Sequence, residues 1–424
     1  MDTIFALSSG SPPAAIGIIR ISGDDAGVAL ERLAGTLPEP RKAALRMLQS
    51  ATGEVLDTAL VLWFPGPSTA TGEDLAELHC HGGRAVIAAV ERELASMTGL
   101  RRAEPGEFTR RAFVNGRMDL AETEGLADLL TAETELQRRS AQALSQGALS
   151  QQVDAWREKL LMLSAQVESV LDFGDEDDVS ELPASFSREV ERLRREIKTW
   201  LERPRAEKLR QGVRVVLAGP PNSGKSTLFN ALLEEAAAIT SAEAGTTRDA
   251  IERSVSLGGV PIVLVDTAGL RGDGAGEIEA IGIERARDQI ERADLILWLG
   301  LEGDGPMGAI EVNAKSDLND IDRKAAPMIC VSAVTGVGLV ELRELIVSRA
   351  KLILPKPGDV ALNTRQAGLL RDSEAALSQI AGKTDALIIG EGLRSCRVAF
   401  DRLTGRTSTE DMLDALFGRF CIGK

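Results

Sequence analysis

A glycine-rich loop between residues 219 and 226 has the residue types and spacing that hold a phosphate group. It reads Gly-Pro-Pro-Asn-Ser-Gly-Lys-Ser, after the apolar run VRVVLA and before the helical pattern TLFNALL. This is the P-loop pattern in its defining context, with a strand before the loop and a helix after it. Because backbone N–H groups and the helix N-terminus favour an anion, Lys225 should reach the β- and γ-phosphates of a nucleotide. Ser226 should bind Mg²⁺, which takes few protein ligands.

The motifs that follow the P-loop point to a guanine nucleotide. The run VLVDTAG predicts a strand that delivers Asp266 to the Mg²⁺ shell and the Gly269 N–H group to the γ-phosphate. Between the two motifs, SAEAGTTRD places Thr247 to close over Mg²⁺ as a switch threonine. The run KSD at 315–317 fits a base-recognition motif. The Asp317 carboxylate can accept hydrogen bonds from guanine's N1 and exocyclic amine, a pattern that adenine does not offer.

One position departs from the usual base-recognition motif. Ala314 stands where Asn is usual, and Asn313 lies one place early. The motif therefore predicts specificity, through Asp317, better than it predicts affinity. The predicted GTP contacts, which include a loop over the base, are Asn222, Ser223, Gly224, Lys225, Ser226, Thr227, Thr247, Asp266, Thr267, Ala268, Gly269, Lys315, Asp317, Ser332 and Ala333. Ordered in this way within one stretch, the motifs predict a GTPase with Mg²⁺ held by Ser226 and Thr247.

The residues that would catalyse hydrolysis are less usual. Leu270 follows the Asp-Thr-Ala-Gly motif, so this position holds no Gln to orient the attacking water. Two candidates remain: Glu279, in the switch-like run LRGDGAGEIEAIGIERA, and a cation near Asn222. Residue type alone favours an ordinary carboxylate on a helix surface for Glu279 over a catalytic one.

The chain ends FCIGK, with a cysteine, Cys421, close to its last residue. Terminal residues are usually frayed and tolerant of change, so a cysteine here calls for a reason. The prenylation motif fits poorly, because Gly423 is not aliphatic, Lys424 is an unusual last residue and no polybasic run precedes it. A thiol that serves the chemistry and one that only packs the tail both remain open.

Composition sets limits on what could position these residues. A chain of 424 residues with 44% hydrophobic and 27% charged residues predicts a globular, soluble protein of two to four domains. The sequence predicts neither a membrane span nor a signal peptide. Four scattered cysteines without CxxC spacing favour a reducing, cytoplasmic location. A net charge of −15 opposes a broad nucleic-acid footprint, so any RNA contacts must come from a local patch or a partner.

The sequence pattern divides the chain into three kinds of region. Residues 1 to about 115 are rich in glycine with short apolar runs, which predicts strands and turns. From 118 to about 210, apolar residues recur at helical spacing, interrupted by the acidic run GDEDDVSELP. Strand and helix patterns alternate from 213 to about 350, and helix returns after LPKPGD. Within this last helical part we expect a capping box of Thr407 with Glu410, and an apolar face of Leu413, Leu416, Phe417 and Phe420.

Motifs from all three kinds of region together resemble the MnmE (TrmE) family of tRNA modification GTPases. They are GIIRISG, STATGEDLAELHCHGG, EPGEFTRRAF, AGTTRD, DTAGLR, IGIERA and the terminal FCIGK. The resemblance implies a multidomain α/β and α fold. An N-terminal α+β domain at 1–116, similar to the folate domain of glycine-cleavage T-protein, would bind folate and form a homodimer. A helical domain at 117–210 and 351–424 would contain the inserted P-loop GTPase domain (G domain) at 211–350.

The resemblance also implies a function and its site residues. Together with the flavoprotein MnmG, the family adds an aminomethyl or carboxymethylaminomethyl group to C5 of the wobble uridine in certain tRNAs. The carbon comes from a tetrahydrofolate derivative, 5-formyl- or 5,10-methylene-tetrahydrofolate. Glu279 corresponds to a water-orienting glutamate, and Cys421 would lie near the one-carbon unit or the uridine. The implied K⁺ shell is Asn222, Ser241, Glu243 and Thr246, of which Ser241 and Thr246 are also implied GTP contacts. The implied folate contacts are Arg20, Glu77, Arg117 and Lys424.

Two other functions compete with this interpretation. A ribosome-assembly GTPase acting as an RNA-binding switch should carry a basic RNA-binding domain after the G domain. Residues 351–424 instead hold 11 Lys and Arg against 9 Asp and Glu, with no interleaved aromatic residues for base stacking. The other alternative is a folate enzyme with the G domain as a regulatory appendage.

The triplet His79-Cys80-His81 could suggest a metal, but adjacent residues of a strand alternate faces and cannot all converge.

Overall fold

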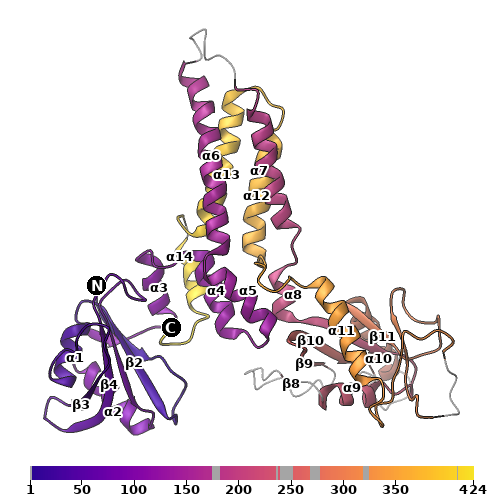
Figure 1. The fold of residues 1–424 in the computed structure, drawn as a ribbon, viewed down its shortest axis with the longest axis horizontal. Coiled ribbons are helices and arrows are strands. Elements are labelled where there is room, and N and C mark those ends of the chain that lie inside the picture. Colours follow the sequence, from indigo (N-terminus) through magenta and orange to yellow (C-terminus); the bar gives the residue numbers. More distant parts are fainter. Residues whose placement is uncertain are drawn as a thin grey trace. The chain divides into compact units, whose positions relative to one another are not determined.

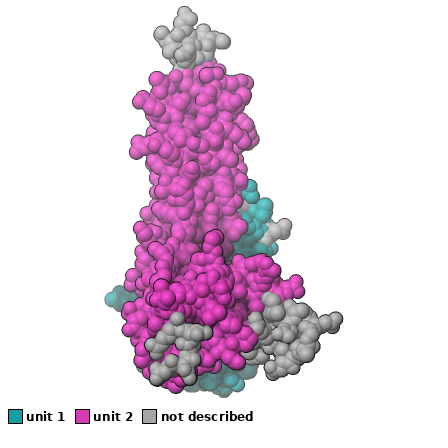
Figure 2. Space-filling model, turned by 90° about the vertical axis from the view of Figure 1, so that its right-hand side faces the viewer, with its two compact units in different colours: residues 1–127, 401–424 teal, residues 128–400 magenta. Residues whose placement is uncertain are grey.

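The computed structural model describes residues 2–173, 182–234, 237–238, 252–267, 277–318, 324–407 and 409–424. Contacts divide the chain into two compact units, residues 1–127 with 401–424, and residues 128–400. Figure 2 shows them in teal and magenta. The first unit joins the two ends of the chain. The finer four-part division expected above stays a prediction.

The first unit is built on one six-stranded sheet of order β3-β4-β5-β2-β1-β6. The strands are β1 Thr3–Leu7, β2 Ile16–Ser22, β3 Ala44–Gln49, β4 Val55–Phe64, β5 Leu75–His81 and β6 Leu100–Arg102. Helices α1 (Ala26–Ala34) and α2 (Arg84–Ala95) share one apolar core with the sheet, to which β2 contributes Ile19 and Ile21. On β1, Ile4 and Ala6 form a second small core with Phe108 of α3 (Glu107–Val114). The alternation of side chains along each strand therefore leaves Arg20, between Ile19 and Ile21, on the side away from the main core.

The C-terminal segment forms part of the same unit. Helix α14 (Glu410–Phe417) and the turn after it bury Leu413, Phe417 and Phe420 against Leu120. Leu416 is partly buried beside them, so the predicted apolar face is confirmed. The predicted capping box is wrong, because the residue before the helix is Thr409. The Thr407 N–H group instead donates to the Asp401 carbonyl at 3.5 Å and helps to close the preceding helix.

The second unit contains an α/β domain with a seven-stranded sheet of order β13-β12-β11-β7-β10-β9-β8. Its strands are β7 Val213–Ala218, β8 Ala237–Ala238, β9 Glu252–Leu257, β10 Val260–Asp266, β11 Leu295–Trp298, β12 Ile310–Asn313 and β13 Ile329–Cys330. Its helices are α9 Lys225–Glu234, α10 Glu277–Glu291 and α11 Leu339–Ile353. Neighbouring strands from β13 to β10 run parallel, and β9 pairs antiparallel with β10. This agrees with the strand–helix alternation in the sequence.

Long helices make up the rest of the second unit, and α6, α7, α12 and α13 lie side by side (Figure 1). The helices are α5 Glu135–Ser145, α6 Ala148–Phe173, α7 Phe186–Leu201, α8 Ala206–Gln211, α12 Thr364–Ile380 and α13 Ala386–Thr404. Helix α4 (Leu120–Thr131) begins in the first unit and ends in the second, and the last residues of α13 belong to the first unit. Trp156 of α6 is fully buried, stacks on Phe400 at 6.0 Å and meets Trp200 edge-on at 5.7 Å. Among the described residues, no helix combines the length and the hydropathy required to cross a bilayer.

The bundle core gives a stability prediction. Trp156→Ala should lower the free energy of unfolding by about 3–5 kcal/mol, because it removes a large buried side chain and leaves a cavity. The matched variant Trp200→Ala should cost less, since Trp200 is only half-buried. Equilibrium urea unfolding followed by far-ultraviolet circular dichroism measures both losses. Equal losses in the two variants would contradict a central role for Trp156.

Candidate functional site

The loop between β7 and α9 has a backbone that its residue types allow. Gly219 and Gly224 have φ of 151° and 97°, and Asn222 has φ of 61°. Glycine reaches these values freely, and asparagine is among the few other residues that tolerate them. A Cβ atom on Gly219 would lie 3.1 Å from the Gly300 amide nitrogen, so this turn is also tight. The loop then runs into α9, which begins at Lys225.

Lys225 lies inside this loop rather than in solvent. The residue is 5% exposed, and its Nζ donates to the carbonyls of Gly219 at 3.0 Å and Pro220 at 2.7 Å. A buried ammonium at a helix N-terminus combines with the helix dipole to attract an anion. The arrangement is that of a phosphate-binding loop.

The parallel pairing of β7 with β10 joins the first two predicted motifs. Asp266 lies opposite Leu217 in the register, at the end of β10. The Ser226 hydroxyl donates to Asp266 Oδ2 at 2.6 Å, and the Thr267 hydroxyl donates to the Leu217 carbonyl at 2.8 Å. A hydroxyl and a carboxylate in contact supply the oxygen ligands that Mg²⁺ prefers.

The predicted base-recognition motif meets the P-loop. Lys315 follows β12 with φ of 57°, and its Nζ donates to the Asn222 carbonyl at 2.6 Å. Ser332 is fully buried and its Oγ accepts from the Thr335 N–H at 3.1 Å, which fixes the loop that holds half-buried Ala333. Asp317 is exposed, and a carboxylate at that position is open to a base.

The departure at Ala314 has a structural consequence. Asn313 is the last residue of β12 and is buried, with its Nδ2 3.7 Å from Cys330 Sγ. Asn313 therefore packs within the sheet, while the half-buried Ala314 occupies the following position. The side chain of Asn313 therefore does not take the place of the Asn that is usual at position 314.

The other predicted nucleotide contacts differ in how far the structure describes them. Ser223 is half-buried, and Thr227 is exposed in the first turn of α9. Glu279 lies in α10, but its side chain is outside the described part. The predicted residues that lie outside the described residues altogether are Ser241, Glu243, Thr246, Thr247, Ala268 and Gly269.

A second polar cluster lies on the sheet of the first unit. Arg20 of β2 and Glu77 of β5 are direct cross-strand partners, and Arg20 Nη2 donates to Glu77 Oε1 at 2.9 Å. His79 Nε2 lies 3.2 Å from Glu77 Oε2, and the Arg20 guanidinium lies 5.9 Å from the Phe108 ring centre. Burial raises the pKa of the Glu77 carboxyl, but Arg20 and His79 outweigh it and hold the pKa below its usual value. Glu77 is therefore a carboxylate at neutral pH.

His79 is the residue of this cluster that sequence reasoning missed. It appeared only as part of a triplet whose side chains should alternate faces, and the alternation is confirmed by the buried Cys80 between half-buried His79 and exposed His81. Burial raises the pKa of Cys80 to about 12, so this thiol is inert. The two-residue spacing of Glu77 and His79 on one strand was the available signal for their contact.

The other two predicted folate contacts lie in the same unit without a described contact to the Arg20–Glu77 pair. Arg117 Nε donates to the Thr69 carbonyl at 3.1 Å. Lys424 is half-buried, and its backbone N–H donates to the Cys421 carbonyl at 3.2 Å. The structure thus joins Arg20 to Glu77 directly and gives Arg117 and Lys424 separate backbone partners.

The C-terminal tail is fixed against the N-terminal segment of this unit. Ile422 forms a β-bridge with Pro105, and Gly106 donates its N–H to the Cys421 carbonyl at 3.5 Å. Gly423 has φ of 92°, and a Cβ atom there would lie 2.2 Å from the Leu7 carbonyl oxygen. The tail is thus an ordered part of the unit, while Cys421 itself is exposed.

An ionic contact supports the same docking. Arg110 of α3 donates to Glu410 at 2.6 Å and to Asp414 at 2.8 Å, both on α14. Exposed pairs of this kind contribute little individually, so the apolar contacts of Phe417 and Phe420 carry most of the attachment.

The fold and the phosphate loop define the class of this protein as a P-loop GTPase. Comparison with known proteins narrows it further. The model of the MnmE helical domain matches residues 120–421, and that of the GTP-binding protein TrmE N-terminus matches residues 3–117. The chain belongs to the MnmE family of tRNA modification GTPases.

Two relatives illustrate the likeness. A tRNA modification GTPase MnmE of Erythrobacter litoralis is 62% identical over 424 residues, which cover 100% of both chains. One of Novosphingobium aromaticivorans is 59% identical, again over 100% of both chains. Among solved structures, the G domain of the T. maritima FeoB iron transporter is 30% identical over 32% of this chain and 98% of its own, with a TM-score of 0.23.

The close approach at Gly423 gives a prediction. Gly423→Ala should release the tail, because the new Cβ would overlap the Leu7 carbonyl and the left-handed backbone would add about 1–2 kcal/mol of strain. Carboxypeptidase B should then remove Lys424 at least about tenfold faster. Ile422→Ala is the control, since Ile422 is exposed and bridges Pro105 through its backbone. Equal release from wild type and the Gly423 variant would contradict the docking.

Proposed function

We propose that this protein hydrolyses GTP and, with a partner flavoprotein of the MnmG kind, modifies the wobble uridine of certain tRNAs. The product carries an aminomethyl or carboxymethylaminomethyl group at C5, whose carbon comes from 5-formyl- or 5,10-methylene-tetrahydrofolate. The observation that carries this proposal is the full-length likeness, at 62% identity, to a protein named tRNA modification GTPase MnmE. The contact of Ser226 with Asp266 supports the nucleotide part.

In the nucleotide site, the proposed roles follow from position. Lys225 neutralises the phosphates, and the loop N–H groups orient them. Ser226 and the switch Thr247 ligate Mg²⁺, with Asp266 in its shell. Mg²⁺ bound there would neutralise charge on the β- and γ-phosphate oxygens. The 2.6 Å separation of Ser226 Oγ from Asp266 Oδ2 fits a shared ion. Asp317 selects guanine.

For hydrolysis we propose Glu279 and K⁺ in place of a glutamine and an arginine finger. Glu279 orients the attacking water. Asn222 and the backbone carbonyls of Ser241, Glu243 and Thr246 would hold K⁺, which when bound would supply positive charge near the leaving phosphate. The left-handed backbone of Asn222, fixed by the Lys315 hydrogen bond to its carbonyl, supports a dedicated role for this residue.

For folate we propose Arg20, Glu77, Arg117 and Lys424. The lowered pKa of Glu77 keeps it a carboxylate, which suits the guanine-like amide–amine edge of a pterin. Glu77 Oε1 already accepts from Arg20 Nε at 3.1 Å and Nη2 at 2.9 Å, whereas Oε2 has one contact, to His79 Nε2 at 3.2 Å, and has room for a further hydrogen bond. The basic side chains suit the glutamate tail of the cofactor. The ordered tail supports a role for Cys421 close to that site.

We further propose a homodimer through the N-terminal domain, the division at 116, 210 and 350, and a cytoplasmic location. The whole proposal is tested by deleting the gene, complementing with wild type and measuring wobble nucleosides of total tRNA by mass spectrometry. The C5 group should vanish on deletion and return on complementation. Unchanged tRNA in the deletion strain would overturn the proposed function.

The cation assignment gives a prediction for hydrolysis. GTP turnover should be roughly 10²-fold faster in K⁺ than in Na⁺ at equal ionic strength, the usual effect of one group that stabilises transition-state charge. Asn222→Ala should abolish the difference while GTP still binds. Steady-state phosphate release in the two salts measures both effects. Equal rates for the wild type in K⁺ and Na⁺ would refute the assignment.

The tail thiol gives a separate prediction. Cys421→Ser should keep the fold and K⁺-stimulated GTP hydrolysis while abolishing wobble-uridine modification, because a hydroxyl is a far weaker nucleophile than a thiolate. The buried Cys396→Ser is a control for the chemical change alone. Normal modification by the Cys421 variant would remove the thiol from the chemistry, and lost GTPase activity would assign the tail a structural role.

A further inference from the structure

The G domain is attached to the helical part of its unit at more than its two chain crossings. Helix α5 precedes the G domain in the chain and packs on the turn between β9 and β10. The Leu136 N–H donates to the Gly259 carbonyl at 3.2 Å. The Leu136 side chain is 6% exposed and belongs to the same apolar core as Val213 and Leu264 of the G-domain sheet. Leu136 therefore joins the first turn of α5 to the G-domain core.

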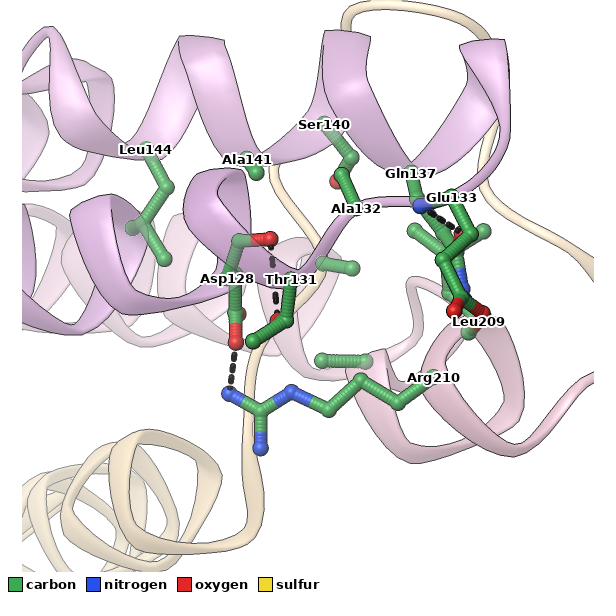
Figure 3. Close-up of a pocket in the computed structure, with 12 residues that line it drawn as sticks. Asp128, Thr131, Ala132, Glu133, Gln137, Ser140, Ala141, Leu144, Leu209 and Arg210 are labelled. Carbon is green, nitrogen blue, oxygen red and sulfur yellow. Dashed lines mark hydrogen bonds and ion pairs between the residues drawn. The ribbon is translucent and has the colours of Figure 1, made fainter. Parts of the chain in front are cut away.

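The next residue of α5 forms a second attachment. Gln137 Nε2 donates to the Leu209 carbonyl of α8 at 3.0 Å, and α8 leads through Gly212 into β7. Figure 3 shows Gln137 and Leu209 together, with Arg210 of α8 paired to Asp128 of α4 at 2.5 Å. Helices α4 and α5 thus hold the segment that enters the G domain.

These attachments lie at the starts of the two strands that carry the nucleotide site. β7 and β10 are neighbours in parallel register, and their far ends deliver the P-loop and Asp266. A strand of six or seven residues spans about 20 Å. Rigid secondary-structure elements can carry coupling between two sites, and these paired strands join the phosphate end of the sheet to the contacts of α5.

We propose that Leu136 and Gln137 are positioning residues through which the nucleotide bound at the P-loop acts on the helical part of the protein. A domain held only by two crossings can pivot without moving its neighbour. The contacts of α5 add a third attachment, so we expect a conformational change in β7 and β10 to alter α5, and by linkage a change in α5 to alter nucleotide affinity. This inference rests on the proposed binding of GTP.

Hydrogen–deuterium exchange on the full chain tests the inference. Exchange of peptides is compared with GDP and with a non-hydrolysable GTP analogue. We expect the two states to differ in the P-loop peptide and also in α5, residues 135–145. A difference in the P-loop peptide without one in α5 overturns the inference. No effect of either nucleotide on the P-loop peptide, relative to the free protein, overturns the proposed GTP binding instead.

A matched pair of double variants separates coupling from general weakening of α5. Leu136→Ala with Gln137→Glu removes the apolar contact and the donor to Leu209, while a glutamate still caps the helix at its third residue. The control is Leu144→Ala with Gln142→Glu, which changes the same residue types on α5; within the described chain, Leu144 is not in the G-domain core cluster. In the first double variant, exchange of α5 should no longer differ between GDP and the GTP analogue, while exchange of the P-loop peptide should still differ. If α5 exchange still depends on the nucleotide in the first double variant, or if this dependence is lost in both double variants, a specific coupling role of Leu136 and Gln137 is contradicted.

Discussion

The parallel pairing of β7 with β10 is the contact on which the nucleotide site depends. It places Asp266 beside Leu217, and from there the carboxylate accepts the Ser226 hydroxyl at 2.6 Å. A shift of one residue in this register would turn every side chain of β10 to the other face of the sheet. The buried apolar side chains of both strands, among them Leu217 and Leu264, set the register and thereby the site. The chemistry is thus specified by residues that never touch the nucleotide.

The contact between the two ends of the chain organises the other unit in the same indirect way. Gly106 and Gly423 have left-handed backbones where a carbonyl oxygen passes too close for a Cβ atom, that of Phe417 in α14 beside Gly106 and that of Leu7 in β1 beside Gly423. They let the tail lie flat along residues 105–106 and beside Leu7. The last residues are therefore part of the unit that carries Arg20 and Glu77. This explains why a short terminal run contains a specific sequence.

Much of the site could be predicted from the sequence because its signals are local. The P-loop and the strand ending in Asp266 were predicted correctly in place, since glycine spacing and an apolar run report directly on the backbone. The capping box at Thr407 was wrong because its competing hydrogen bond, to Asp401, comes from the previous helix. The contact of Leu136 with Gly259 could not be predicted, since it joins residues more than 100 positions apart and has no local pattern.

The central claim is that Ser226 and Asp266 act on one Mg²⁺ ion, and a double-mutant cycle tests it directly. The measurement is the Mg²⁺ dependence of GTP affinity in wild type, Ser226→Ala, Asp266→Ala and the double variant. If the two residues share the ion, each single variant loses most of the Mg²⁺ effect and the double variant loses little more. Losses that multiply in the double variant would show that the residues act independently, and would contradict the account.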